Sequence, residues 1–342
     1  MSAAPRVAVV GASGAVGTTM LRLLRERRFP ASEIVGFASE RSAGTEVEGL
    51  TVQLLEESAI DGFEIALFSA GSSVSREWAP RFAERGAVVI DNSSCWRMDP
   101  EVPLVVSEVN PEKISEHRGI IANPNCSAMQ MLPVLKPIHD AAGLERIVFC
   151  SYQSTSGTGA RAVAELEAQT HAILHGIEPP SPEVYPHQIA FNVLPQVEVF
   201  RDGDDYTTEE RKVIAESRKI LSLPELRITA TCVRVPVPNC HSESLNIETR
   251  VDLSPEDCRS LLARAPGVVV VDDPAAGRYP LASEVAGRDE VFVGRIRRDD
   301  SNPRTLNMWV VGDNLRKGAA TNAIQIAELV VERGLVGAGA AR

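Results

Sequence analysis

The first third of the chain alternates short apolar runs with segments in which apolar residues recur every three or four positions. Residues 6–27, RVAVVGASGAVGTTMLRLLRER, begin with a β-branched run, turn at glycines and continue with leucines set among arginines. This pattern predicts a buried strand followed by an amphipathic helix. Further strand-like runs follow at EIVGFAS (33–39), FEIALFSAG (63–71), AVVIDNSS (87–94), LVVSEV (104–109) and GIIANPN (119–125), with a helix-like run at 73–86. Such alternation predicts a mostly parallel sheet with helices on both faces.

After residue 128 the pattern changes to longer alternating runs. Strands are expected within 146–159, 226–237, 242–253, 289–299 and 305–313, and helices within 159–176, 209–221 and 254–265. Long strands of this kind, with helices on one face, predict an α+β domain whose open sheet supports dimers. The C-terminal run 312–334 predicts an amphipathic helix that packs back on the first domain. We therefore expect residues 1–127 and 313–342 in one domain, and 128–312 in a second, inserted one.

Length and composition fit this division. A chain of 342 residues is too long for one ordinary core, and 44% hydrophobic with 24% charged residues is typical of a soluble globular protein. A net charge of −11 argues against a nucleic-acid partner. No apolar run approaches a membrane span, and the approach to residue 6 lacks signal-peptide features, so we expect a cytoplasmic protein. The six cysteines and six histidines have no metal-site spacing, and no metal is expected.

Three glycines in the first turn suggest a dinucleotide. Gly11, Gly14 and Gly17 let backbone N–H groups and a helix N-terminus approach a pyrophosphate, although their spacing is one residue wider at the start than the usual fingerprint. A βα turn without ligand is the alternative. After the second expected strand, Ser39, Arg41 and Ser42 suit the 2′-phosphate of NADP, while Glu40 is the residue type that an NAD ribose requires. We favour NADP.

A cysteine and a histidine carry the candidate chemistry. Cys126 follows the expected strand at 119–125 and precedes a helix, and a helix N-terminus favours the nucleophilic thiolate. A buried thiol without chemistry is equally consistent with this stretch. His241 follows the turn VPVPNC at the start of an expected strand, although a single histidine is more often structural. Together with a dinucleotide fold, the pair suits thiol attack on an acyl carbon or aldehyde, coupled to hydride transfer.

At this point the sequence resembles a known family, the bacterial form of aspartate-β-semialdehyde dehydrogenase. The resemblance spans nearly the whole chain and rests on motifs in a fixed order: GASGAVG, ASERSAG, FSAGSSVS, VIDNSSCWRM, VSEVNP, ANPNCS, SYQSTSGTG, AESRKIL, VRVPV with CHSE, and GDNLRKGAATNAIQIAE. It implies a Rossmann-like dinucleotide-binding domain with an inserted α+β catalytic and dimerisation domain that has a mixed sheet.

The resemblance also implies roles for single residues. Cys126 attacks the acyl phosphate to give a thioacyl enzyme, which NADPH reduces, and His241 is the acid/base partner. Gln153 is a catalytic residue that lies near the thiol and orients the substrate or the thiohemiacetal, and Asn125 binds the substrate. Arg234 would clamp the substrate α-carboxylate, Glu216 the amino group, and Arg97 with Lys219 the phosphate. Without the resemblance, Glu216 and Lys219 would be a surface ion pair. The implied cofactor contacts are Gly11, Ser13, Gly14, Ala15, Val16, Ser39, Arg41, Ser42, Ala70, Gly71, Ser156, Gly157 and Asn314.

The implied reaction is the reversible, NADP-dependent conversion of L-aspartyl-4-phosphate to L-aspartate-4-semialdehyde with release of phosphate. It serves the biosynthesis of lysine through diaminopimelate, and of threonine, methionine and isoleucine. The expected partners are these small molecules and a second copy of the chain in a homodimer, with a tetramer as the alternative.

Two departures from the family pattern stand next to the expected catalytic residues. Ser127-Ala128 follows the cysteine where the family often has Ser-Thr or Thr-Thr, and Cys240 precedes the histidine where a glycine or alanine is common. A second thiol at this place predicts an oxidation-sensitive site.

Three other functions remain open. N-acetyl-γ-glutamyl-phosphate reductase shares the chemistry but resembles NPGCY rather than NPNCS at the nucleophile. Glyceraldehyde-3-phosphate dehydrogenase places its histidine much closer in sequence to its cysteine. A catalytically silent paralogue acting as a binding subunit is disfavoured by the joint presence of Cys126, Gln153, Arg234 and His241.

Overall fold

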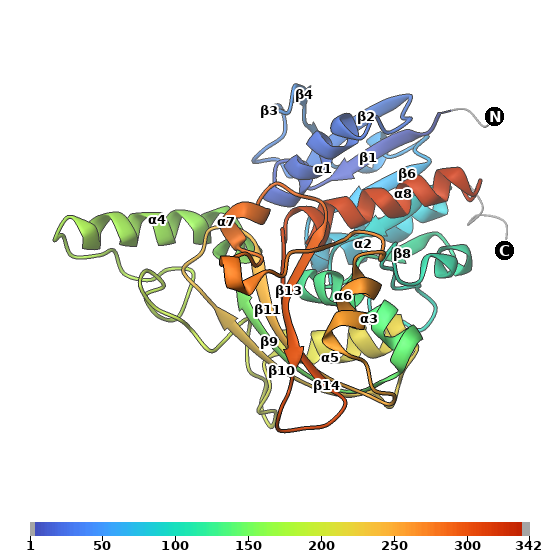
Figure 1. Ribbon diagram of the computed structural model, residues 1–342. Helices are drawn as coiled ribbons and strands as arrows, with labels where there is room; N and C mark the ends of the chain where they lie inside the picture. Colours follow the sequence, from blue (N-terminus) through green and yellow to red (C-terminus); the bar gives the residue numbers. More distant parts are fainter. Residues whose placement is uncertain (1–3, 337–342) are drawn as a thin grey trace. The chain divides into compact units, whose positions relative to one another are not determined.

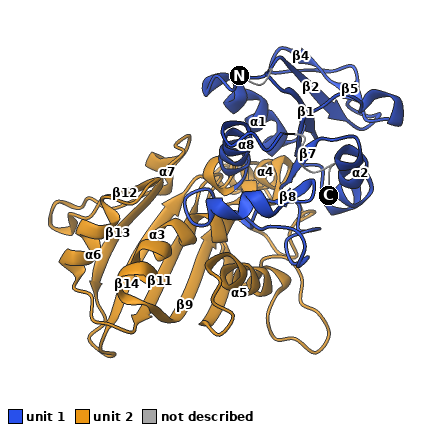
Figure 2. Cartoon of the chain, turned by 90° about the vertical axis from the view of Figure 1, so that its right-hand side faces the viewer, with its two compact units in different colours: residues 1–125, 319–342 blue, residues 126–318 orange. Residues whose placement is uncertain are grey.

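The computed structural model describes residues 4–336 (Figure 1). The chain forms two compact units, the first made of residues 1–125 and 319–342 and the second of residues 126–318 (Figure 2). The boundaries therefore lie at 125/126 and 318/319, where the sequence suggested 127/128 and 312/313. Cys126 is the first residue of the second unit. Among residues 4–336, no helix is long and apolar enough to cross a membrane.

The first unit is built on a six-stranded parallel sheet with the strand order β5-β2-β1-β6-β7-β8. Each strand pairs in parallel with its neighbours, as the alternation of strands and helices predicted. The strands are β1 (Arg6–Val10), β2 (Glu33–Ala38), β5 (Gln53–Leu54), β6 (Ile65–Phe68), β7 (Val88–Asp91) and β8 (Ile120–Ala122), with a small hairpin of β3 (Glu46–Val47) and β4 (Leu50–Thr51). The helices are α1 (Ala15–Glu26), α2 (Ser72–Glu84) and α8 (Asn322–Glu332), with 3-10 turns at Glu57–Ala59 and Pro111–Glu116.

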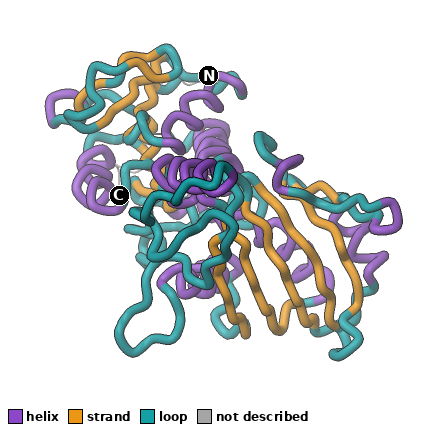
Figure 3. The backbone as a smooth tube through the Cα atoms, turned by 90° about the vertical axis from the view of Figure 1, so that its left-hand side faces the viewer, coloured by secondary structure: helices purple, strands orange, loops and turns teal. Residues whose placement is uncertain are grey.

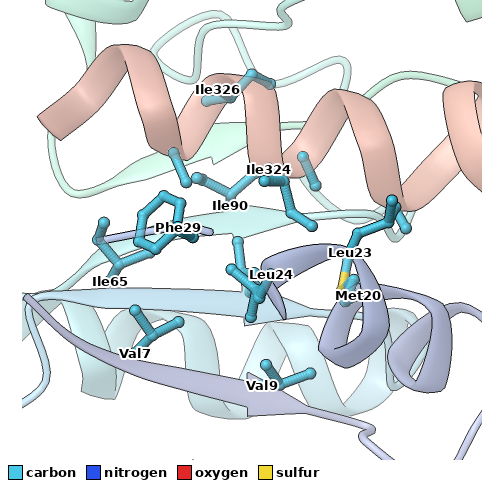
Figure 4. Packing of buried hydrophobic residues seen from close by; sticks show 14 of the residues in the cluster. Val7, Val9, Met20, Leu23, Leu24, Phe29, Ile65, Ile90, Ile324 and Ile326 are labelled. Atoms are coloured by element: carbon cyan, nitrogen blue, oxygen red, sulfur yellow. The ribbon is translucent and has the colours of Figure 1, made fainter. Parts of the chain in front are cut away.

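Both faces of this sheet are buried. Val7 and Val9 of β1 point to one face, where Met20, Leu23 and Leu24 of α1 meet Ile324 and Ile326 of α8 (Figure 4). Ala8 and Val10 point to the other face and join a cluster with Phe37, Phe68 and Phe82. Burial on both sides explains the nearly continuous apolar strands, which are typical of a parallel sheet covered by helices. The C-terminal helix thus packs on the first unit, as expected.

One expected strand is wrong. The run 104–109 forms a single bridge, from Leu104 to Ala122, and then a turn in which the carbonyl of Val106 accepts the N–H groups of Val109 and Asn110. The Asn110 side chain is the cause. Its Oδ1 accepts the N–H of Val106 and its Nδ2 donates to the carbonyl of Leu104. These backbone groups are therefore satisfied locally and cannot pair with a neighbouring strand.

The second unit is built on a mixed six-stranded sheet with the order β10-β9-β11-β14-β13-β12. The pairs β10/β9 and β12/β13 are parallel, and the central pairs around β11 and β14 are antiparallel. The strands are β9 (Leu144–Gln153), β10 (Arg227–Arg234), β11 (His241–Thr249), β12 (Val268–Val270), β13 (Val291–Arg298) and β14 (Thr305–Gly312).

Helices cover one face of the mixed sheet. α3 (Cys126–Ala142) packs on the central strands, α5 (Thr208–Leu221) on β10, and α6 (Pro255–Leu262) on β12 and β13. Figure 3 shows the strands side by side with helices behind them. The unit also contains α4 (Ala160–Leu174), α7 (Ala282–Val285), 3-10 turns at Thr155–Thr158 and Pro274–Ala276, and a π-helical turn at Arg316–Thr321 that leads back to the first unit. Both predicted architectures are thus confirmed: a parallel α/β unit and an α+β unit with a mixed sheet.

Replacing Gly17 by alanine tests the first βα turn. A Cβ on Gly17 would lie 2.1 Å from the carbonyl oxygen of Gly11, whereas a Cβ on Gly14 would lie 3.4 Å from the same atom. We expect Gly17→Ala to destabilise the protein by about 1–3 kcal/mol, because the turn must open, and Gly14→Ala to have little effect on stability. Thermal unfolding of the two variants measures the difference. Equal unfolding midpoints for Gly17→Ala and Gly14→Ala would contradict the close approach of Gly17 to the Gly11 carbonyl.

Candidate functional site

In the first unit, three loops follow the carboxyl ends of neighbouring strands β2, β1 and β6. The loop after β1 turns at Gly11, which has a φ of +89° and whose added Cβ would lie 2.9 Å from the backbone nitrogen of Ala70. The N–H of Gly11 donates to the carbonyl of Phe37 at the end of β2. The glycine therefore allows three strand ends to approach one another. In open α/β sheets, ligands bind at this carboxyl edge.

This edge fits a dinucleotide. Ser13, Gly14 and Ala15 are exposed at the N-terminus of α1, where backbone N–H groups and the helix dipole favour a phosphate. Ser39 and Arg41 are exposed directly after β2, and Ser42 is half-buried with its N–H bonded to the carbonyl of Ser39. The other expected contacts in this unit lie on the same loops: Val16 in the first turn of α1, and Ala70 with Gly71 between β6 and α2.

Arg97 is held at the ends of β7 and β8 in the same unit. Its side chain is only 8% exposed, its Nε donates to the carbonyl of Asn123 (2.9 Å) and its Nη2 to the carbonyl of Asn92 (2.7 Å). Asn125 is buried at the end of the same segment, as the last residue of the unit. A guanidinium fixed by two backbone carbonyls is oriented before any anion arrives.

In the second unit, Cys126 is the first residue of α3 and is half-buried. A thiol at a helix N-terminus lies where the helix dipole favours the thiolate. The backbone of Gly318 lies close to it, since a Cβ on this glycine would stand 3.0 Å from Cβ of Cys126. The expected position of the cysteine at a helix start is confirmed by the structure.

His241 is fully buried at the start of β11, and its hydrogen bonds define its tautomer. The backbone N–H of Ser154 donates to Nδ1 at 3.1 Å, so Nδ1 is an acceptor and the ring proton of the neutral imidazole lies on Nε2. Nε2 has no hydrogen-bond partner among residues 4–336. Burial, followed by the positive charge of Arg234, holds the pKa of His241 well below its ordinary value. The ring is therefore neutral at physiological pH and offers one N–H donor.

Arg234 ends β10 on the same side of the sheet and is 4% exposed. Its Nη1 donates to the carbonyl of Ser154 (2.5 Å), and its guanidinium lies 5.8 Å from the ring centre of Tyr185. Gly157 separates this arginine from the histidine: an added Cβ would lie 3.1 Å from Nη1 of Arg234 and 3.0 Å from Cε1 of His241. The glycine expected at the cofactor thus adjoins both side chains.

Gln153 is hydrogen-bonded to Glu209, a buried glutamate in the first turn of α5. Its Nε2 donates to Oε1 of Glu209 (3.1 Å) and to the hydroxyls of Ser127 and Ser151 (both 3.2 Å). Glu209 is 4% exposed, and its Oε2 lies 3.9 Å from Nζ of Lys212. Glu216, which the resemblance implies at the substrate amino group, is a different residue of the same helix.

Glu216 and Lys219 lie on the same face of α5, two helical turns further on. Seven residues of helix separate Glu209 from Glu216, a rise of about 10 Å. Glu216 is buried and Lys219 half-buried. The pair Glu209/Lys212 has the same spacing as the pair Glu216/Lys219, so spacing could not distinguish them. Glu209 was missed because it directly precedes the capping-box residue Glu210, and acidic residues are common in a first helical turn.

Ser156 and Asn314 form a polar network beside the histidine. Oδ1 of Asn314 accepts hydrogen bonds from the hydroxyl of Ser154 (3.0 Å) and the N–H of Cys240 (3.0 Å), and its Nδ2 donates to the Ser156 hydroxyl (2.9 Å). The hydroxyl of Ser154 also lies 3.1 Å from Nδ1 of His241. These two expected cofactor contacts therefore support the segment that holds the imidazole.

Cys240 does not have the properties expected of an oxidation-sensitive thiol. It is 1% exposed and packs with Val285, Phe292 and Val311, and burial together with the charge of Asp313 raises its pKa to about 12. Such a thiol stays protonated and unreactive. Its φ of +70° is left-handed, which explains in physical terms why glycine suits this position. Residues 4–336 contain no group of three or more potential metal ligands.

A Rossmann-like unit, together with a second unit that contains a helix-start cysteine, a buried histidine and a buried arginine, is typical of an NAD(P)-dependent dehydrogenase. Family models described as "Semialdehyde dehydrogenase, NAD binding domain" and "Semialdehyde dehydrogenase, dimerisation domain" match residues 6–117 and 135–317. The chain belongs to the aspartate-semialdehyde dehydrogenase family, as its sequence motifs indicated.

Individual relatives support this membership over the full length. The aspartate-semialdehyde dehydrogenase of Aquifex aeolicus is 54% identical, with 97% of this chain and 99% of the relative covered. The Bacillus subtilis enzyme is 49% identical, with 96% and 98% covered. The crystal structure of aspartate semialdehyde dehydrogenase II from Vibrio cholerae, complexed with ASA, is 47% identical with a TM-score of 0.93, covering 97% of this chain and 99% of that one.

Gly157→Ala tests the packing between histidine and arginine. Gly157 has no positive φ, so the backbone accepts alanine, but the new methyl group must displace His241 or Arg234. We expect a fall in kcat/KM of about 10- to 100-fold, with little change in the unfolding midpoint. Steady-state kinetics and thermal unfolding measure both. Wild-type kinetics in the variant would show that the two side chains need no fixed position.

Proposed function

We propose that the aspartate-semialdehyde dehydrogenase activity of this chain, an oxidoreductase activity of aspartate-family amino-acid biosynthesis, proceeds through a thioester on Cys126. The direction of biosynthesis converts L-aspartyl-4-phosphate to L-aspartate-4-semialdehyde and phosphate, toward lysine, threonine, methionine and isoleucine. The observation that carries the proposal is the single edge of the mixed sheet at which Gln153, Arg234 and His241 lie. Arg234 suits carboxylate binding and His241 oxyanion stabilisation, and Cys126, at the start of the helix that packs on these strands, suits nucleophilic attack.

The covalent steps balance with the Cys126 thiol as nucleophile, phosphate as leaving group and a hydride that NADPH would supply when bound. The Cys126 thiolate attacks the acyl carbon of the acyl phosphate, the C–S bond forms, and the C–O bond to phosphate breaks. Bound NADPH supplies the hydride that reduces the thioester. The resulting alkoxide collapses to the aldehyde and releases the Cys126 thiolate, which the N-terminus of α3 stabilises.

His241 acts in this scheme through its Nε2–H. The imidazole donates a hydrogen bond to the acyl oxygen as negative charge develops there. Action as a base would require Nε2 to lose its proton and Nδ1 to gain one, against the N–H of Ser154 that already points at Nδ1. Of the acid/base role implied by the resemblance, we therefore retain only hydrogen-bond donation from Nε2–H, without proton transfer.

Substrate groups are assigned by charge and geometry. Arg234 would bind the α-carboxylate and Arg97 the phosphate, since both guanidinium groups are pre-oriented by backbone carbonyls. For the α-amino group we now favour Glu209 over Glu216, because Glu209 is bonded to Gln153. With this assignment, Lys212 becomes an alternative to Lys219 as the second residue that binds the phosphate. The Vibrio cholerae relative was solved with ASA, which supports a site for the semialdehyde in this family.

For the cofactor we propose NADP. Exposed Ser39 and Arg41, with Ser42, can hydrogen-bond a 2′-phosphate, and the glycine turn at the start of α1 would hold the pyrophosphate. Glu40 on the same turn is consistent with weaker use of NAD.

We also propose a homodimer in the cytoplasm. Helices cover one face of the mixed sheet, and its other face carries half-exposed residues of the central strands, with Tyr152 and Trp309 in ring contact at 5.3 Å. The family model for this region is described as a dimerisation domain. A second copy on this face would bury these rings.

Turnover of three aldehydes tests the assignment of substrate. Purified protein should reduce NADP in a phosphate-dependent reaction with aspartate semialdehyde, and not with N-acetylglutamate semialdehyde or glyceraldehyde-3-phosphate. Cys126→Ala should lose activity by a factor of about 10⁴ or more, because no thioester can form. Activity with another aldehyde instead, or an active Cys126→Ala variant, would contradict the proposal.

Two matched substitutions on α5 test the glutamate assignment. Glu209→Gln should raise KM for aspartate semialdehyde about tenfold or more, because an ion pair to the amino group is lost. Glu216→Gln, the same change two turns further on, should have the smaller effect. Steady-state kinetics at saturating NADP and phosphate measure both. The reverse order of effects would restore Glu216 as the amino-group ligand.

A further inference from the structure

One buried glutamate has no place in the scheme above. Glu243 lies in β11, two residues after His241, and is fully buried. Neither of its carboxyl oxygens has a hydrogen-bond partner among residues 4–336. Buried polar groups of native proteins are almost always hydrogen-bonded, so two orphaned oxygens in one side chain require an explanation.

A second orphaned acceptor lies in the helix that begins at Cys126. Gln130 follows the cysteine by one turn of α3 and is fully buried. Its Nε2 donates to the carbonyl of Gly312 at 3.1 Å, while its Oε1 has no partner among residues 4–336. Reversing the amide would set two oxygens against each other, so the present orientation is the one that the hydrogen bond supports.

The strand register places both side chains near Gly312, on the helix-covered face of the sheet. β11 pairs with β14 so that His241 faces Gly312 and Glu243 faces Val310. Glu243 and His241 alternate with outward residues, and both point to the helix-covered face. Gln130 lies over Gly312 on that face, because a Cβ on Gly312 would stand 2.8 Å from Cγ of Gln130. Glu243 and Gly312 are diagonal neighbours, a separation that long side chains span.

One proton would provide a hydrogen bond for two of these three buried oxygens. An ionised Glu243 would leave a bare charge beside the equally bare Oε1 of Gln130. A protonated Glu243 has an O–H that can donate to that oxygen. We propose that Glu243 is a positioning residue, a neutral carboxylic acid whose O–H donates to Oε1 of Gln130 and so fixes the His241 strand pair against the helix that begins at Cys126.

The local charges agree with a neutral acid. Burial raises the pKa of Glu243 well above its ordinary value. Two ionisable groups lie on the same buried face of the sheet near Glu243. They are His241, two residues earlier on the same strand, and Cys232 of β10, which lies in the same row beyond Ser151. A neutral Glu243 also leaves the neutral state of His241 undisturbed.

The proposed hydrogen bond connects the helix that begins at Cys126 with the strand that begins at His241. Gln130 joins α3 to β14 through the Gly312 carbonyl, and the proposed bond joins it to β11. The Gln130 side chain would then connect the Cys126 helix to both strands of the β11/β14 pair, through the Gly312 carbonyl and the Glu243 carboxyl group. Loss of the donor should therefore lower kcat without removing any group that touches substrate.

Infrared difference spectroscopy tests the protonation state directly. The spectrum of the wild type minus that of Glu243→Gln, at neutral pH, should contain the C=O band of a protonated carboxylic acid. The band should move to higher frequency in a Gln130→Met background, where its hydrogen bond is lost. Glu248→Gln is the matched control on the same strand: Glu248 is ion-paired with Arg227 at 3.6 Å, and its difference spectrum should lack this band. Absence of the band for Glu243, or a band that Gln130→Met leaves unmoved, would overturn the proposal.

Kinetics test the positioning role. Glu243→Gln keeps a donor and should retain kcat within about twofold, with an unchanged pH profile, whereas Glu243→Met should lower kcat about tenfold at nearly constant KM. Gln130→Met should lower kcat by about the same factor as Glu243→Met. The double variant Gln130→Met/Glu243→Met should lower kcat little more than either single substitution. Equal losses in Glu243→Gln and Glu243→Met, or additive losses, would overturn the role. If Glu243→Met fails to fold, Gln130→Met and the infrared band still decide. The kinetic arm rests on the proposed role of His241, while the infrared arm does not, so the two can fail separately.

Discussion

The mechanism that we propose depends on one backbone hydrogen bond, from the N–H of Ser154 to Nδ1 of His241. It takes up the acceptor nitrogen of a fully buried imidazole and leaves the proton on Nε2. The segment that supplies it is itself fixed, because the N–H groups of Thr155 and Ser156 donate to the carbonyls of Val237 and Pro238, in the turn before His241. Burial and the nearby Arg234 disfavour the imidazolium. The histidine is thereby limited to a neutral donor.

Strand direction explains why the reacting groups come from distant parts of the chain. β9 and β10 run parallel and end at Gln153 and Arg234, while β11 runs antiparallel to β9 and begins at His241. The ends of two strands and the start of a third therefore meet at one edge of the sheet. Since α3 packs on these strands and begins at Cys126, its first turn contributes to the same unit. A sheet with another strand order would separate these residues.

Much of this arrangement could be predicted from the sequence. The glycine turn, the amphipathic helices and the strand alternation are local patterns, and they predicted both units and the position of Cys126 at a helix start. The run 104–109 was misjudged because the side chain of Asn110 binds backbone groups that a strand would use. Glu209 was overlooked because a first-turn glutamate resembles an ordinary helix start. The unpartnered state of Glu243 could not be predicted at all, since it depends on register and burial and not on sequence pattern.

The tautomer of His241 is the most direct test of this account. Protein labelled with ¹⁵N in its six histidines, compared with His241→Asn to assign the signal, reports the state of each ring nitrogen by NMR. The account predicts a neutral ring with the proton on Nε2 throughout about pH 6–8, the range in which an ordinary histidine titrates. A signal for the Nδ1–H tautomer, or for an imidazolium that titrates within that range, would contradict it.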